Sequence, residues 1–127
     1  MDTFEQFNNG SLVLPSKTVA FANLKWNAHP TFKGVYLKHI VTAADTNGTF
    51  SYHLVKIDPG CKIALHTHNP QLETHEVISG EGICLNDGKT LDYKPGTISI
   101  IPAQIPHEVT AGDKGLYLFA KFMPALC

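Results

Sequence analysis

Arginine is absent from this 127-residue chain, whose ten basic residues are all lysines. Planar, two-point recognition of phosphate or carboxylate usually falls to arginine. An anionic ligand would therefore have to bind through lysine, histidine, backbone N–H groups or a metal ion. The formal net charge of −1 gives no electrostatic reason to expect nucleic acid or an anionic membrane as a partner. A small-molecule ligand is the expected partner.

Targeting and disulfide signals are also missing. The N-terminal residues lack the positive charge and apolar run of a signal peptide, and no uncharged apolar run is long enough to span a membrane. The three cysteines (Cys61, Cys84 and Cys127) are odd in number and have no spacing typical of a disulfide framework. A reducing cytoplasm is the expected location. Cys127, the last residue, is expected to lie on a mobile tail.

Helical periodicity is absent from every stretch of ten or more residues. Segments rich in β-branched and aromatic residues instead follow one another from about Thr18 onward. The expected strands are Thr18 to Trp26, Gly34 to Thr42, Thr49 to Ile57, Lys62 to His66, Leu72 to Ile78, Gly82 to Leu85, Thr97 to Ile101, His107 to Thr110 and Leu116 to Met123. Asn47-Gly48 and Asp87-Gly88 are typical of short hairpin turns.

The domain organisation follows from this pattern. Residues 1–17 form a polar lead-in that could supply an edge strand or an exchanged strand, and residues 18–127 are expected to form a single β domain. Strands separated by short turns, with no helices between them, favour an all-β fold, an antiparallel barrel or double-sheet jelly roll. Such a barrel can hold a small ligand in its interior or mouth.

Three histidines and one glutamate have the spacing of a metal site. His66 and His68 are two residues apart, so in an extended segment they leave the same face. A turn at Asn69-Pro70 can return Glu73 to meet them, and His107 follows Pro106 into a later strand. Imidazole and carboxylate groups suit Zn, Fe, Mn, Ni or Cu. Spacing alone favours a metal site but leaves open that these are ordinary surface or core histidines.

The same segment resembles the first sequence motif of the cupin superfamily. Its glycines, histidines and glutamate stand at the spacing of the family: Gly60, His66, His68, Glu73 and Gly80. The second motif is similar but incomplete, with Gly96, Pro102 and His107 in place. Gln104 stands where a glycine is usual and Ala111 where an asparagine is usual, which puts the shape of the loop in question. The resemblance covers about 60–111. It implies a jelly-roll barrel with a divalent metal ion on His66, His68, Glu73 and His107.

Residues near the motif have both functional and structural interpretations. In a regular strand Glu73 and His75 share a face, whereas Glu76 points the other way and is expected to be a solvated charge. His75 could support the metal ligands or touch substrate, and a packed, hydrogen-bonded histidine is an equal alternative. Gln104 lies close enough to His107 to be a pocket candidate. Structural or superficial roles are expected for the histidines without partners at ligand spacing: His29, His39 and His53.

Three functions remain open. Four protein ligands around an ion that prefers six leave two positions for water, O₂ or a chelating substrate. The cupin resemblance implies a mononuclear metalloenzyme of the dioxygenase or isomerase type acting on a small oxygen-bearing metabolite. The alternatives are a non-catalytic sensor or binding domain and a structural metal in a self-associating barrel. The sequence leaves the substrate open, as well as the choice among Fe, Mn, Ni and Zn. Metal affinity is expected to fall below about pH 6. A homodimer is expected because similar barrels bury an edge sheet or exchange N-terminal strands.

Overall fold

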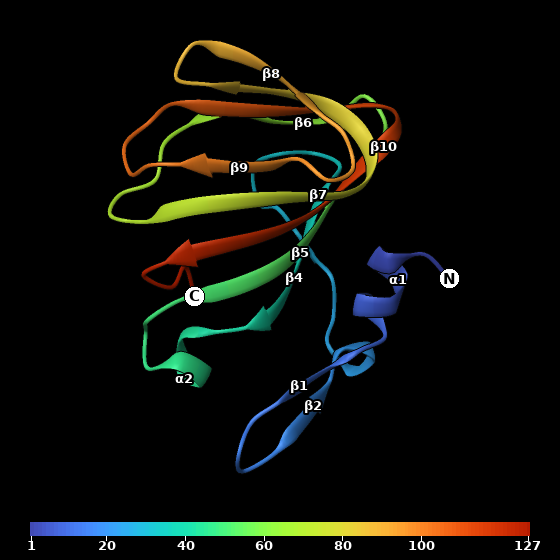
Figure 1. The fold of residues 1–127 in the computed structure, drawn as a ribbon, viewed down its shortest axis with the longest axis vertical. Coiled ribbons are helices and arrows are strands. Elements are labelled where there is room, and N and C mark those ends of the chain that lie inside the picture. Colours follow the sequence, from blue (N-terminus) through green and yellow to red (C-terminus); the bar gives the residue numbers. More distant parts are fainter.

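The computed structural model describes residues 1–127, most of which lie in antiparallel strands joined by short connections (Figure 1). The strands are β1 (Ser11–Val13), β2 (Thr18–Ala20), β3 (Asn27–Ala28), β4 (Val35–Val41), β5 (Ser51–Ile57), β6 (Lys62–His66), β7 (Leu72–Asn86), β8 (Lys89–Tyr93), β9 (Ile98–Ile101) and β10 (His107–Met123). The helices are α1 (Thr3–Asn8), the 3₁₀ turn η1 (Phe21–Asn23) and α2 (Ala43–Thr46). None of them has the length and apolar character to cross a bilayer.

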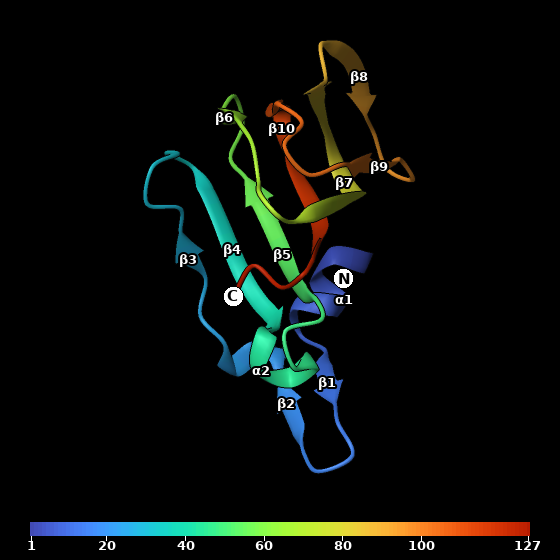
Figure 2. The same ribbon diagram turned by 90° about the vertical axis from the view of Figure 1, so that its left-hand side faces the viewer.

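Two long strands, β7 and β10, form the frame of the domain and take part in both of its layers. The first half of β10 pairs with β6 and its second half with β5, while β7 pairs along its length with β10. The start of β7 pairs with β9 and its end with β8. β4 and β3 extend the layer beyond β5, so the strands fan out in two layers (Figure 2). The predicted antiparallel jelly roll is confirmed.

The strand pattern places an apolar core between these layers. In β5 and the second half of β10, side chains buried inside the barrel alternate with side chains on the other face. The interior cluster contains twelve residues: Val35, Val55, Ile57, Val77, Cys84, Tyr93, Val109, Ala111, Leu116, Leu118, Ala120 and Phe122. Their burial removes apolar surface from water, which is the main force holding the two layers together.

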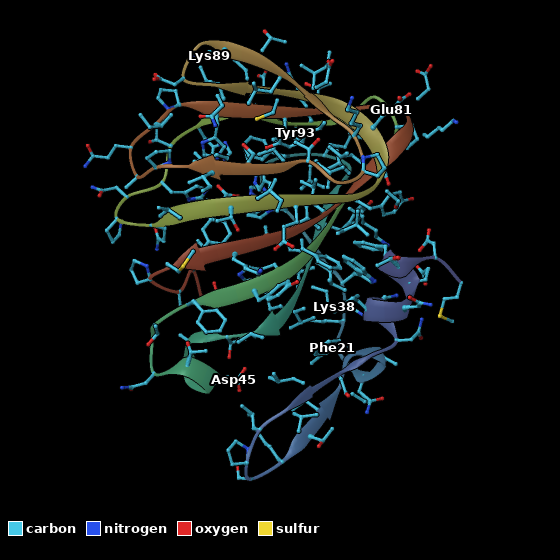
Figure 3. All side chains as sticks on the ribbon, in the orientation of Figure 1. Phe21, Lys38, Asp45, Glu81, Lys89 and Tyr93 are labelled. Carbon is cyan, nitrogen blue, oxygen red and sulfur yellow. The ribbon has the colours of Figure 1, made fainter.

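The N-terminal segment covers the outer face of the same strands. Phe4 of α1 and Phe21 of η1 are 2% and 5% exposed, and they pack in a second apolar cluster with Phe119 of β10. The buried Lys38 Nζ donates to the Phe21 carbonyl oxygen at 3.0 Å, which joins β4 to this segment (Figure 3). β1 pairs with β2 in a separate two-stranded sheet.

Four local predictions are corrected by the structure. The continuous strand expected over Thr18 to Trp26 is instead β2, η1 and β3. The sequence around Asn47 forms no simple hairpin, because Asn47 is the left-handed C-cap of α2 at φ 53°. The two strands expected on either side of Gly80 form the single strand β7, and the two expected on either side of 112–115 form β10. The turns expected between them are only a shift in the pairing register of β7 and β10. Strand β8 was not predicted, although the Asp87-Gly88 turn that precedes it was.

The last three residues are held against the domain, contrary to the mobile tail predicted for Cys127. The Ala125 N–H donates to the Gly48 carbonyl oxygen at 3.1 Å. The Leu126 N–H donates to Ser51 Oγ at 2.8 Å. The Cys127 carbonyl oxygen accepts from the Ala43 N–H at 2.7 Å. The tail therefore returns to the loop around α2 at the end of β4.

Candidate metal centre

The four side chains singled out by the sequence come together at one end of the barrel. His66 ends β6 and is paired in register with His107, the first residue of β10. Glu73 is the second residue of β7, and His68 lies in the loop that joins β6 to β7. One potential ligand atom from each of the four lies within 4.8 Å of the others. Strand pairing thus assembles residues up to 41 positions apart.

The spacing of these atoms is that of ligands around one small cation. Nε2 of His66 lies 3.1 Å from Nε2 of His68. Glu73 Oε1 lies 3.1 Å from His107 Nε2 and 3.5 Å from His68 Nε2. Two ligands that are each about 2.1 Å from one ion are about 3.0 Å apart at a right angle and about 3.4 Å apart at the tetrahedral angle. The three distances fall at or close to these values.

Hydrogen bonds orient the rings of His66 and His107 so that a nitrogen lone pair of each faces the space between the four ligand atoms. The Nδ1–H of His66 donates to the Ala64 carbonyl oxygen at 2.7 Å, and that of His107 donates to the Ile105 carbonyl oxygen at 3.0 Å. In the neutral rings Nε2 is then an acceptor. Glu73 Oε1 and His107 Nε2 are both buried without a hydrogen-bond partner. Two facing acceptors repel unless a cation or a proton lies between them, so the residues present fit a metal ion.

A buried relay fixes the orientation of Glu73. The Nε2–H of His75 donates to Glu73 Oε2 at 2.6 Å, and the Tyr93 hydroxyl donates to His75 Nδ1 at 2.8 Å. Glu73, His75 and Tyr93 are 5%, 2% and 1% exposed, respectively. His75 thus supports the carboxylate through a hydrogen bond, one of the two roles open to it from the sequence. This leaves Glu73 Oε1 free to face the histidines.

The electrostatics of the centre favour a charged carboxylate beside largely neutral rings. Burial alone would raise the pKa of Glu73, but the adjacent His75 and His107 outweigh it, and the pKa is lowered. Burial lowers the pKa of His66 and His68. The pKa of His107 is raised, because the facing Glu73 carboxylate and the Ile105 carbonyl oxygen together outweigh its burial.

A cavity of about 90 Å³ opens beside the cluster. His66, His68 and Glu73 form one side of it, together with His75. The remaining lining is His29 and seven apolar residues: Leu37, Val55, Ile63, Leu118, Ala120, Phe122 and Leu126. No lysine lines this cavity, so a bound anion would depend on a metal ion or on imidazole N–H groups.

Comparison with known proteins identifies the family. The model of the cupin domain family matches residues 53–120, which is more than half of the chain. The chain belongs to the cupin family. Over 69 residues this cupin is 39% identical to the L-ectoine synthase of Saccharophagus degradans, covering 53% of this chain and 52% of the relative. Over 55 residues it is 27% identical to the oxalate-binding protein of Thermotoga maritima, covering 43% and 46%. The chain spans about half the length of these curated relatives.

Solved structures agree on the fold of this cupin. A predicted oxalate decarboxylase from Thermotoga maritima superposes with a TM-score of 0.74, covering 89% of this chain and 99% of that one. At 21% sequence identity this likeness concerns the fold alone. It nevertheless extends well beyond residues 53–120, so flanking strands outside the family match share the same architecture.

The second cupin motif departs from its usual pattern at Gln104, and the backbone explains why a glycine is usual there. Gln104 has φ 68°, in the left-handed region that glycine adopts at little cost. Its N–H donates to the His68 carbonyl oxygen at 2.7 Å, which holds the loop that carries His68. The Gln104 side chain is exposed and is not among the residues that line the cavity.

Other residues differ from their predicted roles or complete them. Glu76 points away from the cluster, as predicted, and its Oε1 lies 2.6 Å from Lys121 Nζ. His29, expected to be structural or superficial, lines the cavity; its Nδ1 accepts the N–H groups of Thr31 and Phe32, so the neutral ring carries its proton on Nε2. No spacing rule links His29 to the motif, because it reaches the cavity only through the pairing of β3 with β4.

Proposed function

We propose that this cupin is a mononuclear metalloenzyme of the dioxygenase or isomerase type, with one divalent ion held by His66, His68, Glu73 and His107. The observation that carries the proposal is the pair of buried, unpartnered atoms, Glu73 Oε1 and His107 Nε2, that face each other 3.1 Å apart. When bound, the ion would act as a Lewis acid toward an oxygen ligand or activate O₂, in the coordination positions that four protein ligands leave open.

The cavity supports a small substrate with two oxygen donors. A space of about 90 Å³ next to the ligand atoms accommodates few non-hydrogen atoms. Its apolar walls would keep water from the reacting oxygens, which strengthens electrostatic interactions inside the site. Because no lysine or arginine lines it, a carboxylate or enolate would bind through the ion. The name of one relative, an oxalate-binding protein, supports a small chelating acid as the ligand class.

His29 supplies the one imidazole of the cavity that lies outside the cluster and the Glu73 relay. With its Nδ1 occupied by two backbone N–H groups, its Nε2–H is the ring's donor. On this proposal His29 donates a hydrogen bond to the end of the substrate that is turned away from the ion. Burial lowers the pKa of His29, which keeps the ring neutral near pH 7.

The activity test compares turnover with binding. Protein reconstituted with Fe²⁺, Mn²⁺ or Zn²⁺ would be mixed with small keto, hydroxy and dicarboxylic acids, while O₂ uptake and the products are followed. Turnover that His107→Ala abolishes would support the enzyme. Tight binding without turnover would favour the second candidate, a non-catalytic metabolite or metal sensor. The second candidate is favoured by one observation: both nitrogens of His75 are engaged, so the cavity holds few free acid–base groups.

Metal affinity should fall as the pH is lowered from about 8 to about 5, because each imidazole must be neutral to bind. The raised pKa of His107 means that a proton competes for this ring at higher pH than for a free imidazole. The lowered pKa values of His66 and His68 delay their competition to more acidic pH. The slope of log affinity against pH should therefore steepen as the pH falls. A flat titration across this range would contradict histidine ligation.

Replacing His75 with phenylalanine should lower metal affinity by about 10- to 100-fold, the usual loss when a partner that orients a ligand is removed. The phenyl ring keeps the volume but leaves Glu73 Oε2 and the Tyr93 hydroxyl without their partner. A chelator competition assay measures the change. The control is Glu76→Gln, one residue along the same strand, which loses only an ion pair to Lys121 on the other face. Equal affinities in the two variants would remove the orienting role of His75.

A further inference from the structure

A second group of metal-ligating side chains lies on the inner face of β4 and β5. His39 and His53 are directly opposite each other in the register of these strands, and their Nδ1 atoms are 2.7 Å apart. The returning tail adds Cys127, and one potential ligand atom of each residue lies within 4.8 Å of the others. The group combines two imidazoles and a thiol, which suits a borderline or soft cation better than an alkaline-earth ion.

The hydrogen bonds around this group are those of a supported site. The three backbone bonds of residues 125–127 hold Cys127 next to the two rings. Ser51 Oγ accepts the Leu126 N–H and lies 2.8 Å from His53 Nε2, so it can also accept the Nε2–H of that ring. His53 Nδ1 then carries a lone pair directed at His39. One serine thus links the position of the tail to the tautomer of a ring, as polar partners behind metal ligands do.

Both rings are available as neutral ligands near pH 7. Burial, with a further contribution from His39, lowers the pKa of His53 to about 4, and burial lowers the pKa of His39. Burial raises the pKa of the Cys127 thiol, so the free thiol stays protonated, and a cation that binds it must displace that proton.

Phe122 separates this group from the first centre. Its ring centroid is 5.5 Å from that of His53 and 5.0 Å from that of His68, so one phenyl ring lies between the two clusters. His39 lines a cavity of about 200 Å³ on the side of β3. This cavity adjoins the first, since His29, Leu37 and Leu126 line both. The two groups share no ligand residue.

We propose that His39, His53 and Cys127 form a second metal site, for a zinc-like cation, with its fourth position open toward this 200 Å³ cavity. Ligand bonds of about 2.0 Å to nitrogen and about 2.3 Å to sulfur require the Nδ1 atoms to move apart by about half an ångström. The ion replaces the N–H···N hydrogen bond between the two Nδ1 atoms, and the proton of that bond moves to the Nε2 atom of a ring. The thiol proton is released to solvent, one for each ion bound.

Cobalt distinguishes this site from the first, because only a thiolate ligand gives an intense near-ultraviolet charge-transfer band with Co²⁺ and the first centre contains no cysteine. Anaerobic titration of the reduced protein should bind two Co²⁺ ions and develop this band, which Zn²⁺ then removes. His66→Ala should retain the band and bind one ion fewer. Cys127→Ser should lose the band while retaining one ion, with far-ultraviolet circular dichroism showing that the fold is kept.

Cys61→Ser is the matched control, because Cys61 is a free cysteine outside the group, and this variant should behave as the unmodified protein. The proposal is overturned if the unmodified protein shows no thiolate band with saturating Co²⁺. It is equally overturned if the band persists in Cys127→Ser. Loss of the band in His66→Ala would show that the thiolate site does not form independently of the first centre and would also overturn the proposal.

Discussion

Replacing His107 with alanine is expected to lower the affinity for a divalent ion at the first centre by more than about 100-fold. Loss of an outer partner of a ligand costs about 10- to 100-fold, and loss of a ligand itself should cost more. His107 is 1% exposed, and its Nε2 is one of the two buried atoms without a partner. Its removal leaves Glu73 Oε1 with His68 as the nearest remaining histidine of the cluster, at 3.5 Å.

Competition with a chromophoric chelator measures this loss, in a Cys127→Ser background so that the second group does not contribute. His29→Ala is the matched control, since His29 lines the same cavity and takes no part in the cluster. The control should keep its affinity within a few-fold of the parent. A His107→Ala protein that binds the ion as tightly as the control would show that the ion, if any, lies elsewhere.

Replacing Gly80 with alanine is expected to lower the free energy of unfolding by about 3 kcal/mol or more. Gly80 has φ 76°, a conformation that disfavours any side chain with a Cβ atom. An added Cβ would lie 2.1 Å from the carbonyl oxygen of Gly115 and 3.1 Å from Leu116 Cα. Both contacts are with backbone, which cannot rotate away, so β7 and β10 would have to separate at the point where their register shifts.

Gly88→Ala is the control that isolates the contact from the conformation. Gly88 has φ 77°, and an added Cβ would meet nothing within 4 Å. Gly88→Ala should lower the free energy of unfolding by only about 1 kcal/mol, the cost of the left-handed conformation. Urea unfolding of the two variants gives the comparison. Similar losses of unfolding free energy in the two variants would show that the close contact at Gly80 adds nothing to the cost of the left-handed conformation.

The sequence predicts the first centre well because its geometry is local. The period of two places His66 and His68, and likewise Glu73 and His75, on shared faces, and the structure also turns Glu76 outward as that period requires. Only His107 had to come from a distant strand; its place after Pro106 suggested it, and the cupin resemblance supported it. The strand-rich pattern predicted an all-β barrel or jelly roll, and the cupin resemblance selected the jelly-roll barrel.

The second group could not be predicted, because nothing local relates its members. His39 meets His53 through the register of β4 and β5, and Cys127 reaches them only because the tail turns back to Ala43. The same holds for the N-terminal segment, where burial of Phe4 and Phe21 against the outer face overrides the strand propensity of 18–26. Tertiary contacts, which no spacing rule contains, decide all of these positions.

The most direct test of the first centre is anomalous diffraction from crystals of the protein loaded with Zn²⁺, with data collected on both sides of the zinc absorption edge. We expect a peak about 2.0–2.2 Å from Nε2 of His66, His68 and His107 and from Glu73 Oε1. A fully loaded crystal with no anomalous density between these four atoms would contradict it.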